Sequence, residues 1–450
     1  MKRIFFALGI SFCASHPAIA GNLSEVEQIG GAHVVEVDQH GEPETNNNSK
    51  IRQEGAGHHV SIEQTGFLQS TVSTIEQTGQ DNEVRFYQFG GISDSLIRQD
   101  GADNLADVQQ ISAFGATRLT IDQTGTANRA KVDQGGADAN MDLHLRQQGT
   151  DHHADLQQTG EGADWSEVDQ SGQGNDAKLL QYSEDGASGT ISIWQAGSGN
   201  KADSNQLAFS GMSNNLQIRQ SGVDNTAGGE QSGADGENRV NIDQTGQANT
   251  ATVYQTGSGM PGFLALNEAI IVQSGENNVA DVYQRTQFGS DISAITQLGT
   301  DNIAHVQQRG IHDLQKSEIF VNGNANVVDV LQGEELASQI FDISSIQVNG
   351  NGNTTTIRQG GQWGQNTSGI VQTGNDNAIL VDQTASHPSG FLGGDLAQND
   401  SVIEVNGTSN LTTVTQSVDT AGGGAPGSNS SILNIVGNGI TTTVTQSVGP

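Results

Sequence analysis

The stretch Ser95–Gln110, SLIRQDGADNLADVQQ, consists of two short runs of alternating polar and apolar residues around one glycine. In the first run Ser95, Ile97 and Gln99 share one face of an extended chain, and every second residue of the second run does the same. Gly101 and its polar neighbours separate the two runs. The pattern predicts a strand, a turn at the glycine and a second strand.

The same pattern recurs seventeen times when the chain is aligned on this glycine. The aligned residues are Gly30, Gly55, Gly79, Gly101, Gly125, Gly149, Gly172, Gly197, Gly222, Gly246, Gly275, Gly299, Gly323, Gly350, Gly374, Gly407 and Gly437. A fixed glycine is typical of a turn that needs positive φ or a close backbone approach. We therefore expect turn glycines at these positions.

Three polar positions keep a fixed distance from the glycine. Gln stands two residues before it in thirteen units, Asn stands three residues after it in thirteen, and Gln stands nine residues after it in all seventeen. Well-conforming units give the candidate residues Gln53, Gln77, Gln99 and Gln123 for the first position, Asn82, Asn104 and Asn128 for the second, and Gln64, Gln88, Gln110 and Gln134 for the third. Such regular spacing argues against a disordered acidic chain, the first alternative that this composition raises.

One unit alone has no core, so the units must stack to be stable. The sequence predicts an all-β fold, a two-sheet parallel β-solenoid with one strand–turn–strand unit per turn. Seventeen turns at roughly 4.8 Å each give a rod of about 80 Å. Each inward amide can then bond to the equivalent amide of the next turn, as in cross-β assemblies, which avoids a loss of about 1–3 kcal/mol per unpaired group.

An outward position, three residues before the glycine, alternates in charge over the first seven units. Its residues are Glu27, Arg52, Glu76, Arg98, Asp122, Arg146 and Asp169. Stacked in register, each charge lies between two opposite ones, and such cross-strand pairs contribute roughly 0.2–1 kcal/mol each. We expect this row to help fix the order of the turns.

The N-terminus has the features of a secretory signal peptide over residues 1–20, with a basic start, an apolar segment and cleavage after Ala20. Cys13, the single cysteine, is lost with it, so the mature chain has no disulfide. Solenoid repeats are expected over 21–383, a loop containing Gly and Pro over 384–400, and two terminal repeats of the same solenoid over 401–450.

Composition and charge exclude several classes of function. Without Lys2 and Arg3 the chain has 16 basic and 51 acidic residues, a formal charge of −35, which argues against nucleic-acid binding. No later apolar run is long enough for a membrane-spanning helix. We expect no catalytic residues, no cofactor and no metal: His58 and His152 of the two His-His pairs stand in the Asn position, and the acidic residues are scattered on outward faces.

The motif Ser-x-aliphatic-x-Gln-x-Gly-x-x-Asn-x-Ala-x-Val-x-Gln resembles the curlin repeat of curli fibre subunits over nearly all of the mature chain. The resemblance implies export through a dedicated pore in the outer membrane of a Gram-negative bacterium. It also implies self-assembly at the cell surface into amyloid fibres for adhesion and biofilm matrix. The implied partners are further copies of the chain, other curlin-like subunits or a nucleator.

Two other functions remain open at this point. One is a monomeric or surface-anchored β-solenoid adhesin that uses its acidic sides to bind a surface or a cation. The other is a glycan-active β-helix enzyme, which requires converging carboxylates. Solenoids that stay monomeric need capped ends, and the sequence shows a repeat starting at Ser24 and another ending at Gln446. This favours a structural protein that polymerises through exposed terminal turns.

Overall fold

The computed structural model describes residues 21–41, 45–66, 70–136, 140–210, 213–234, 236–258, 265–311, 314–333, 341–386, 397–419 and 427–449. The predicted signal peptide, with Cys13 and Ala20, lies outside the described residues. The same holds for 387–396, the centre of the predicted loop over 384–400, while β-strands occupy both ends of that range. Within the described ranges all regular elements are β-strands, 32 in number, and none is a helix.

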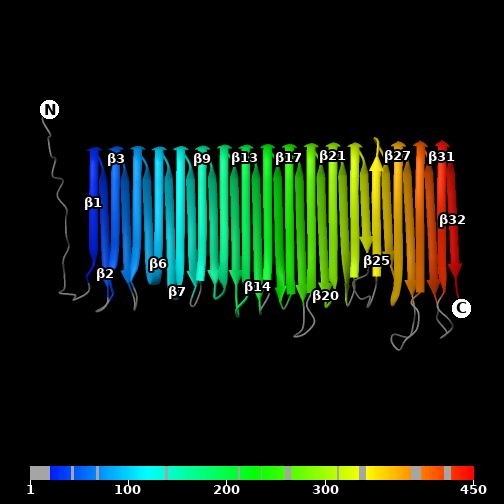
Figure 1. Ribbon diagram of the computed structural model, residues 1–450, viewed down its shortest axis with the longest axis horizontal. Helices are drawn as coiled ribbons and strands as arrows, with labels where there is room; N and C mark the ends of the chain where they lie inside the picture. The colour runs from blue at the N-terminus through cyan, green and yellow to red at the C-terminus, as the bar shows by residue number, and fades with distance from the viewer. Residues whose placement is uncertain are drawn as a thin grey trace.

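The strands lie side by side along a straight rod, with β1 and β32 at opposite ends (Figure 1). The first strands of the units are β1 Leu23–Gly31, β3 Asn47–Ala56, β5 Thr71–Gln80, β9 Asn140–Thr150, β11 Ala163–Gln173, β13 Ser188–Ser198, β15 Ser213–Val223, β17 Gly236–Gln247, β19 Ala265–Glu276, β21 Ser290–Thr300, β23 Leu314–Asn324, β25 Phe341–Asn349, β27 Gly364–Asn375, β29 Ala397–Thr408 and β31 Ser428–Asn438. The second strands are β2 Val34–Gly41, β4 His59–Gly66, β8 Arg129–Gly136, β10 His153–Gly160, β12 Asp176–Ser183, β14 Lys201–Phe209, β16 Thr226–Ala234, β18 Thr250–Ser258, β20 Val279–Gln287, β22 Ile303–Ile311, β24 Val327–Gln332, β26 Thr354–Gly360, β28 Ala378–Ser386, β30 Leu411–Asp419 and β32 Thr441–Val448. Two longer strands, β6 Glu83–Ala102 and β7 Leu105–Thr126, each contain the second strand of one unit and the first strand of the next.

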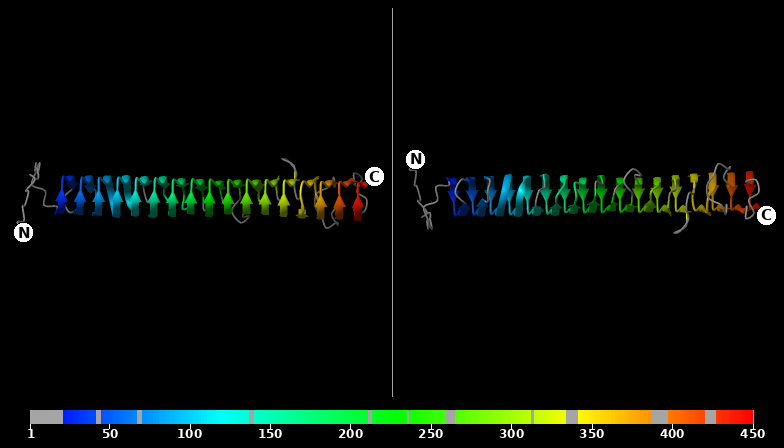
Figure 2. Two further views of the ribbon diagram at one scale, coloured as in Figure 1. Left: turned by 90° about the horizontal axis from the view of Figure 1, so that it is seen from above. Right: turned by 90° about the horizontal axis from the view of Figure 1, so that it is seen from below.

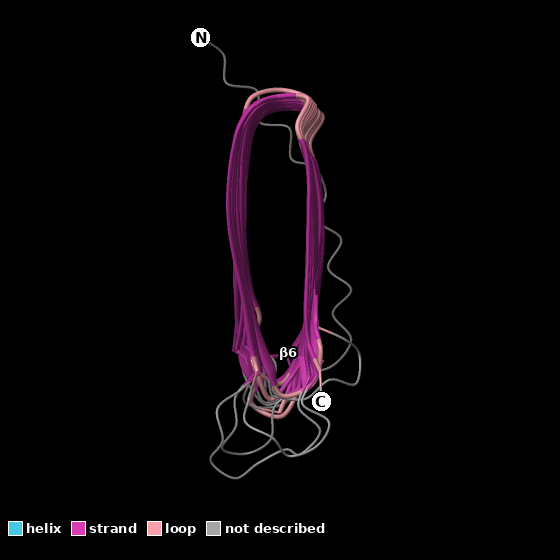
Figure 3. Ribbon diagram, turned by 90° about the vertical axis from the view of Figure 1, so that its right-hand side faces the viewer, coloured by secondary structure: helices cyan, strands magenta, loops and turns pink. Residues whose placement is uncertain are grey.

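Pairing is parallel between equivalent strands of successive turns. β5 pairs with the second half of β6 so that Gln77 faces Gln99 and Gly79 faces Gly101, and β12 pairs with β14 in the same manner. Seen along the rod axis, the stacked turns superpose into one narrow, flattened ring (Figure 3), and the side views in Figure 2 show a thin, straight rod. The molecule is a parallel β-solenoid, as the repeat spacing predicts.

The first and second strands of the units belong to one sheet, whereas the sequence predicted two separate sheets. The return from Gln88 to Gln99 is the shortest in the chain. β6 runs through this corner without a loop, β7 does the same at the next corner, and the pairing of β6 with β7 shifts register between Gly90 and Ile92. As a result all 32 strands belong to one continuous hydrogen-bonded sheet.

The core is a narrow strip of aliphatic side chains between the two sides of the ring. The first strands contribute Ile75, Ile97 and Ile121, and the second strands contribute smaller residues such as Ala106 and Val108, all fully buried. These residues belong to one hydrophobic cluster that extends through the stack. Because apolar burial is confined to this strip, the inward polar side chains beside it must find partners inside the rod.

Candidate functional site: the buried amide ladders

The turn between the two strands is built from residues in the left-handed region of φ. Gly55, Gly79, Gly101 and Gly125 have φ between 108° and 129°, and each of the seventeen aligned glycines has positive φ. A Cβ atom added to Gly101 would lie 2.0 Å from the carbonyl oxygen of Gly125 in the next turn. The position therefore requires glycine for two reasons, its φ and the close approach of the neighbouring backbone.

A second left-handed residue follows two positions after the glycine, and we did not predict it. Asp81, Asp103 and Asp151 have φ between 52° and 57° at this position. The signal in the sequence is weak because the position holds Asp, Ala, Gly, Asn or Ser in different units. Asp, Asn and Gly tolerate this conformation better than most other residues, which accounts for most of the substitutions.

The first Gln ladder consists of the side chains two residues before the turn glycine. Each Nε2 donates to Oε1 of the equivalent glutamine in the next turn, in an unbroken series of bonds of 2.8–2.9 Å. Its members are Gln28, Gln53, Gln77, Gln99, Gln123, Gln147, Gln170, Gln195, Gln220, Gln244, Gln273 and Gln297. Many Nε2 atoms also donate to a backbone carbonyl, as Gln99 does to Glu83 O. The ladder thus satisfies both ends of each interior amide.

The second Gln ladder, nine residues after the glycine, continues through the whole described rod from Gln39 to Gln446. Its bonds have the same direction as those of the first ladder and lengths of 2.7–3.2 Å. The predicted residues Gln64, Gln88, Gln110 and Gln134 are successive members of it. Serines of the first strands add further bonds, such as Ser166 Oγ to Gln181 Oε1 at 2.8 Å.

The Asn ladder, three residues after the glycine, has the opposite direction. Asn104 Nδ2 and the Asn104 backbone N–H both donate to Asn82 Oδ1 in the preceding turn, each at 3.0 Å. Asn104 Nδ2 also donates to the carbonyl oxygen of Gly125 in the following turn. Asn128 repeats this arrangement with Asn104, so the amide holds the backbone of three successive turns together.

Histidine occupies the Asn position in three units. His58 and His152 are fully buried, and His33 stacks on His58 with 5.1 Å between ring centroids. Nε2 of His58 lies 3.1 Å from Glu54 O, and the backbone N–H of Asn82 donates to His58 Nδ1. Burial lowers the pKa of both His58 and His152, although the hydrogen bonds from Nε2 to backbone carbonyls oppose this effect.

The first Gln ladder ends where valine replaces glutamine. Val321 and Val348 occupy the same position in the next two turns, and both side chains are fully buried. Gln372 follows them, and it pairs in register with Val348 on one side and Val405 on the other instead of with glutamines. Gln372 finds other partners inside the rod. Thr355 Oγ1 donates to its Oε1 at 2.8 Å, and its Nε2 donates to Asn377 O at 2.8 Å. Thr355 stands in a position that holds Ala or Val in most units.

A further buried polar row lies eight residues before the glycine, at the other corner of the ring, and we did not predict it. Asn267 donates to Asn238, and Asn238 donates to Asn214, through the same kind of amide bond as the Asn ladder. Asp164 lies in this row, 2% exposed, and accepts bonds from Ser183 Oγ at 2.6 Å and Gly189 N at 2.9 Å. Burial raises the pKa of its carboxyl, and these two bonds oppose the increase.

The outward charged row forms ion pairs along part of its length. Arg98 lies 3.1 Å from Glu76 and 3.7 Å from Asp122, and Arg52–Glu27 and Arg146–Asp169 are further pairs within 3.5 Å. The side chains are about half exposed, so each pair contributes little on its own. A second alternating row on the opposite side consists of Arg85, Asp107, Lys131, Asp155, Lys178 and Asp203, with Lys131–Asp155 at 3.4 Å.

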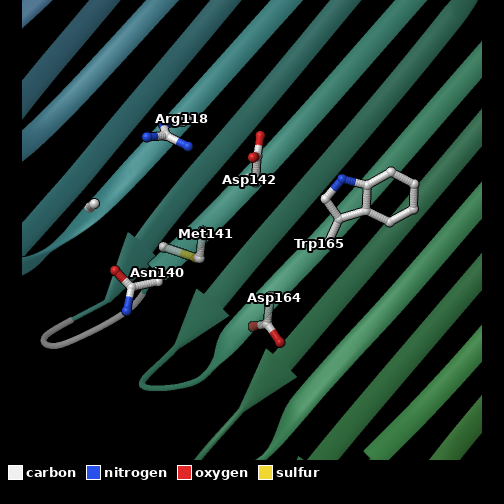
Figure 4. A pocket seen from close by; sticks show the side chains of 7 residues that line it. Arg118, Asn140, Met141, Asp142, Asp164 and Trp165 are labelled. Carbon is white, nitrogen blue, oxygen red and sulfur yellow. The ribbon is translucent and has the colours of Figure 1, made fainter.

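A shallow hollow of about 360 Å³ lies on the outer face of β7, β9 and β11 (Figure 4). Arg118, Asp142 and Trp165 face each other there across neighbouring strands, and Asp164 lies beside them. The two carboxylates have different surroundings, since Asp164 is buried with its own partners and Asp142 lies opposite Arg118. In the described part of the chain, no three His, Cys, Asp or Glu side chains come together as metal ligands.

Comparison with protein-family models finds no match for this chain, and comparison with curated proteins finds none. Over the described ranges, no helix has the length and apolar character needed to cross a membrane. The amide ladders are thus the most extensive chemical feature that the structure offers for an interpretation of function.

Proposed function

We propose that the protein is a secreted structural protein, a curli-like amyloid fibre subunit that supports cell adhesion and biofilm matrix and has no enzymatic role. The observation that carries the proposal is the second Gln ladder, in which each interior amide bonds to its equivalent in the turns before and after it. In-register parallel stacking of equivalent residues with amide ladders is the arrangement of cross-β assemblies. In this proposal the two sides of the ring correspond to the two sheets of a curlin-like coil, which are joined here through β6 and β7.

The ends of the described rod support association with further copies. Among the described strands, β1 pairs only with β3, and β32 pairs only with β30. Within the described residues each therefore has one unpaired edge, and such edges template the addition of another chain. Gln446 Nε2 at one end and Gln39 Oε1 at the other continue the direction of the second Gln ladder. A second copy placed head to tail extends this ladder without a change of direction.

The charges of the two ends also favour head-to-tail contact. Residues 21–41 contain Glu25, Glu27, Glu36 and Asp38 and neither Lys nor Arg, whereas residues 427–449 contain no charged side chain. Head-to-head contact brings two acidic ends together, and head-to-tail contact places an acidic end against a neutral one. The proposed partner is therefore a second copy in the same orientation, or another curlin-like subunit or nucleator with a matching turn.

The proposed location is the outer surface of a Gram-negative bacterium, reached through an outer-membrane secretion pore. Nucleic acid is not among the proposed partners, because the formal charge of the whole chain is −33.

The test is whether chains of residues 21–450 assemble. We expect fibres that bind an amyloid dye and give a meridional reflection near 4.7–4.8 Å. The proposal would be contradicted if the size in solution did not change with protein concentration and no fibres formed after long incubation. That result would favour a monomeric adhesin.

A matched pair of variants tests the end contact. Ile440→Lys places a charge on the inward side of the last turn, where Ile440 is partly buried against the core. Thr441→Lys places the same charge on an exposed, outward position one residue later. Inward-pointing charges block edge pairing, so seeds of the unaltered protein should be elongated by Thr441→Lys but not by Ile440→Lys. Circular dichroism checks that both variants keep their β structure, and equal elongation by both would contradict the end contact.

A further inference from the structure

The neutral histidine ring reproduces two of the contacts of the asparagine amide. In Asn units, Asn82 Nδ2 donates to Thr78 O, four residues before it, and Asn82 Oδ1 accepts the backbone N–H of Asn104. In the histidine unit, His58 Nε2 lies 3.1 Å from Glu54 O, also four residues before it. His58 Nδ1 accepts the backbone N–H of Asn82. The Nε2–H tautomer therefore supplies one donor and one acceptor where the amide does.

His152 repeats this arrangement far from His58. Its Nε2 lies 3.1 Å from Gln148 O, and the backbone N–H of Asn175 donates to its Nδ1 at 3.3 Å. The backbone N–H of His152 itself donates to Asn128 Oδ1, as the backbone N–H of an asparagine does at this position. The same substitution thus occurs twice in fully buried positions with the same pair of contacts.

Protonation affects the two side chains differently. A carboxamide does not titrate, whereas a protonated imidazole carries a hydrogen on both nitrogens and accepts no hydrogen bond. A hydrogen on His58 Nδ1 would point at the N–H of Asn82, and the resulting cation would lie about 5 Å from the parallel ring of His33. Acid therefore replaces an attraction between successive turns with a repulsion.

We propose that His58 and His152 are acid-sensitive rungs of the Asn ladder, at which a fall in pH opens the contact between one turn and the next. The inference concerns the single molecule and does not depend on fibre formation. The proposal is based on the hydrogen bonds of the two rings, and neighbouring charged groups change how readily each ring is protonated.

Several titratable groups face the two rings. For His58 these are His33 in the preceding turn, which disfavours protonation, and Asp81 in the following turn, which favours it. For His152 the group is Asp151, next to it in the same turn, which favours protonation. The ladder neighbours of His152, Asn128 and Asn175, are uncharged. Burial outweighs the acidic groups at both positions and lowers the pKa of each imidazole.

The lowered pKa of the two imidazoles determines how the stability of these contacts changes with pH. The unfolded chain protonates these histidines near pH 6.5, the ordinary value, while the folded chain resists protonation to lower pH. The contacts of the two rungs are therefore fully present above about pH 6.5 and weaken as the pH falls below it.

The experiment compares hydrogen–deuterium exchange of peptides that contain Asn82 and Asn175 at pH 7 and pH 5, corrected for intrinsic exchange rates. In the unaltered chain we expect protection at these two sites to be lower at pH 5 than at pH 7, by at most about 25-fold, the limit that the ordinary pKa of 6.5 sets. In the double variant His58→Asn/His152→Asn, which has the residue of the other units, protection should be the same at both pH values. The control is His59→Asn/His153→Asn, which changes the neighbouring, more exposed histidines and should behave like the unaltered chain.

Two results would overturn the proposal. One is a loss of protection in His58→Asn/His152→Asn as large as in the unaltered chain, and the other is no loss in the unaltered chain. Nitrogen-15 spectra of histidine-labelled, unaltered protein give a second measurement that needs no substitution. They should show the neutral Nε2–H form of the two buried rings at pH 7, and the opposite tautomer at pH 7 would also contradict the inference.

Discussion

At the scale of single residues, the rod is stabilised by buried glutamine side chains. Each is satisfied because an identical side chain lies in the turn before it and in the turn after it. Gln147 accepts from Gln123 and donates to Gln170, both at 2.8 Å, and also donates to Arg129 O. Its replacement by leucine leaves Gln170 Oε1 without its ladder donor in a fully buried site. We expect Gln147→Leu to lower the free energy of unfolding by about 1–3 kcal/mol, as measured by chemical denaturation.

The control for this prediction is the next residue. Gln148 is exposed on the outer face, so Gln148→Leu should change stability by no more than about 0.5 kcal/mol. Equal effects of the two substitutions would mean that the ladder bond itself contributes little.

The carboxyl of Asp164 gives a residue-scale prediction with a pH dependence. Because burial raises its pKa in the folded chain, its contribution to stability is present below the ordinary value of 3.8 and is lost as the pH rises through the folded value. Asn214 and Asn238 stand in the same row as uncharged amides. Asp164→Asn should therefore gain stability relative to the unaltered chain as the pH rises from 3 to 7, as followed by urea midpoints. An equal difference in stability between Asp164→Asn and the unaltered chain at pH 3 and at pH 7 would contradict this prediction.

We could predict the positions that hold the same residue type in nearly every unit. We did not predict the positions at which the residue type varies from unit to unit. Glutamine nine residues after the glycine and the glycine itself recur in all seventeen units, so spacing alone locates them. The row that contains Asp164 holds Asn, Asp, Thr, Ser, Gly, Gln or Met, since a corner of the ring accepts any side chain that finds a local partner. The left-handed residue after the glycine varies for a similar reason, because several residue types tolerate that φ.

At the scale of elements, the repeats could be recognised as strands, but their connections could not. The alternation in each unit fixes which face is buried, and the register follows because a shift of one residue would turn the glutamines outward. The glycine spacing shows that the return from Gln88 to Gln99 is the shortest, and β6 is continuous there. However, β7 is also continuous, although its return from Gln110 to Gln123 is as long as the return that separates β4 from β5. The repeat pattern therefore does not determine which strands continue through a corner.

The break in the first Gln ladder gives a prediction at the scale of two neighbouring strands, β26 and β27. Thr355→Val removes the donor to Gln372 Oε1, and Gln372→Val leaves Thr355 Oγ1 without its acceptor, in both cases in a buried site. Each single variant should lose about 1–3 kcal/mol. In the double variant both polar groups are absent, and Val348 and Val405 on either side already form an aliphatic slot.

The double variant should therefore be more stable than either single variant, with a coupling energy of about 1–3 kcal/mol in a denaturation cycle. Additive losses would show that the threonine does not compensate for the isolated glutamine. Thr356→Val, one residue along and outside the core, is the matched control and should show no coupling to Gln372.

At the scale of the whole molecule, the distribution of charge along the rod determines how two rods approach each other. The chain carries a formal charge of −33, but the last described turn is uncharged and the first carries four carboxylates. At 0.1 M salt the Debye length is about 10 Å, so only the turns next to a junction contribute to its electrostatics. Repulsion at a head-to-tail junction therefore acts between Glu25, Glu27, Glu36 and Asp38 of one copy and the acidic residues Asp400, Glu404 and Asp419 of the other, which lie one turn behind its uncharged last turn.

This gives a prediction for the rate of end-to-end association in the proposed fibre. Raising the NaCl concentration from about 10 mM to about 150 mM should accelerate the elongation of seeds, because salt screens the acidic end. Replacing the four carboxylates by the corresponding amides should accelerate elongation at low salt and remove most of the salt dependence. The control is the same number of replacements at four exposed residues in the middle of the rod, Asp224, Glu230, Glu276 and Asp301. These lie at least eight turns, or about 38 Å, from the acidic end, beyond the Debye length of about 30 Å at 10 mM salt. Elongation by this variant should depend on salt as in the unaltered chain. If both sets of replacements changed the salt dependence equally, the total charge rather than the charge at the acidic end would govern the encounter.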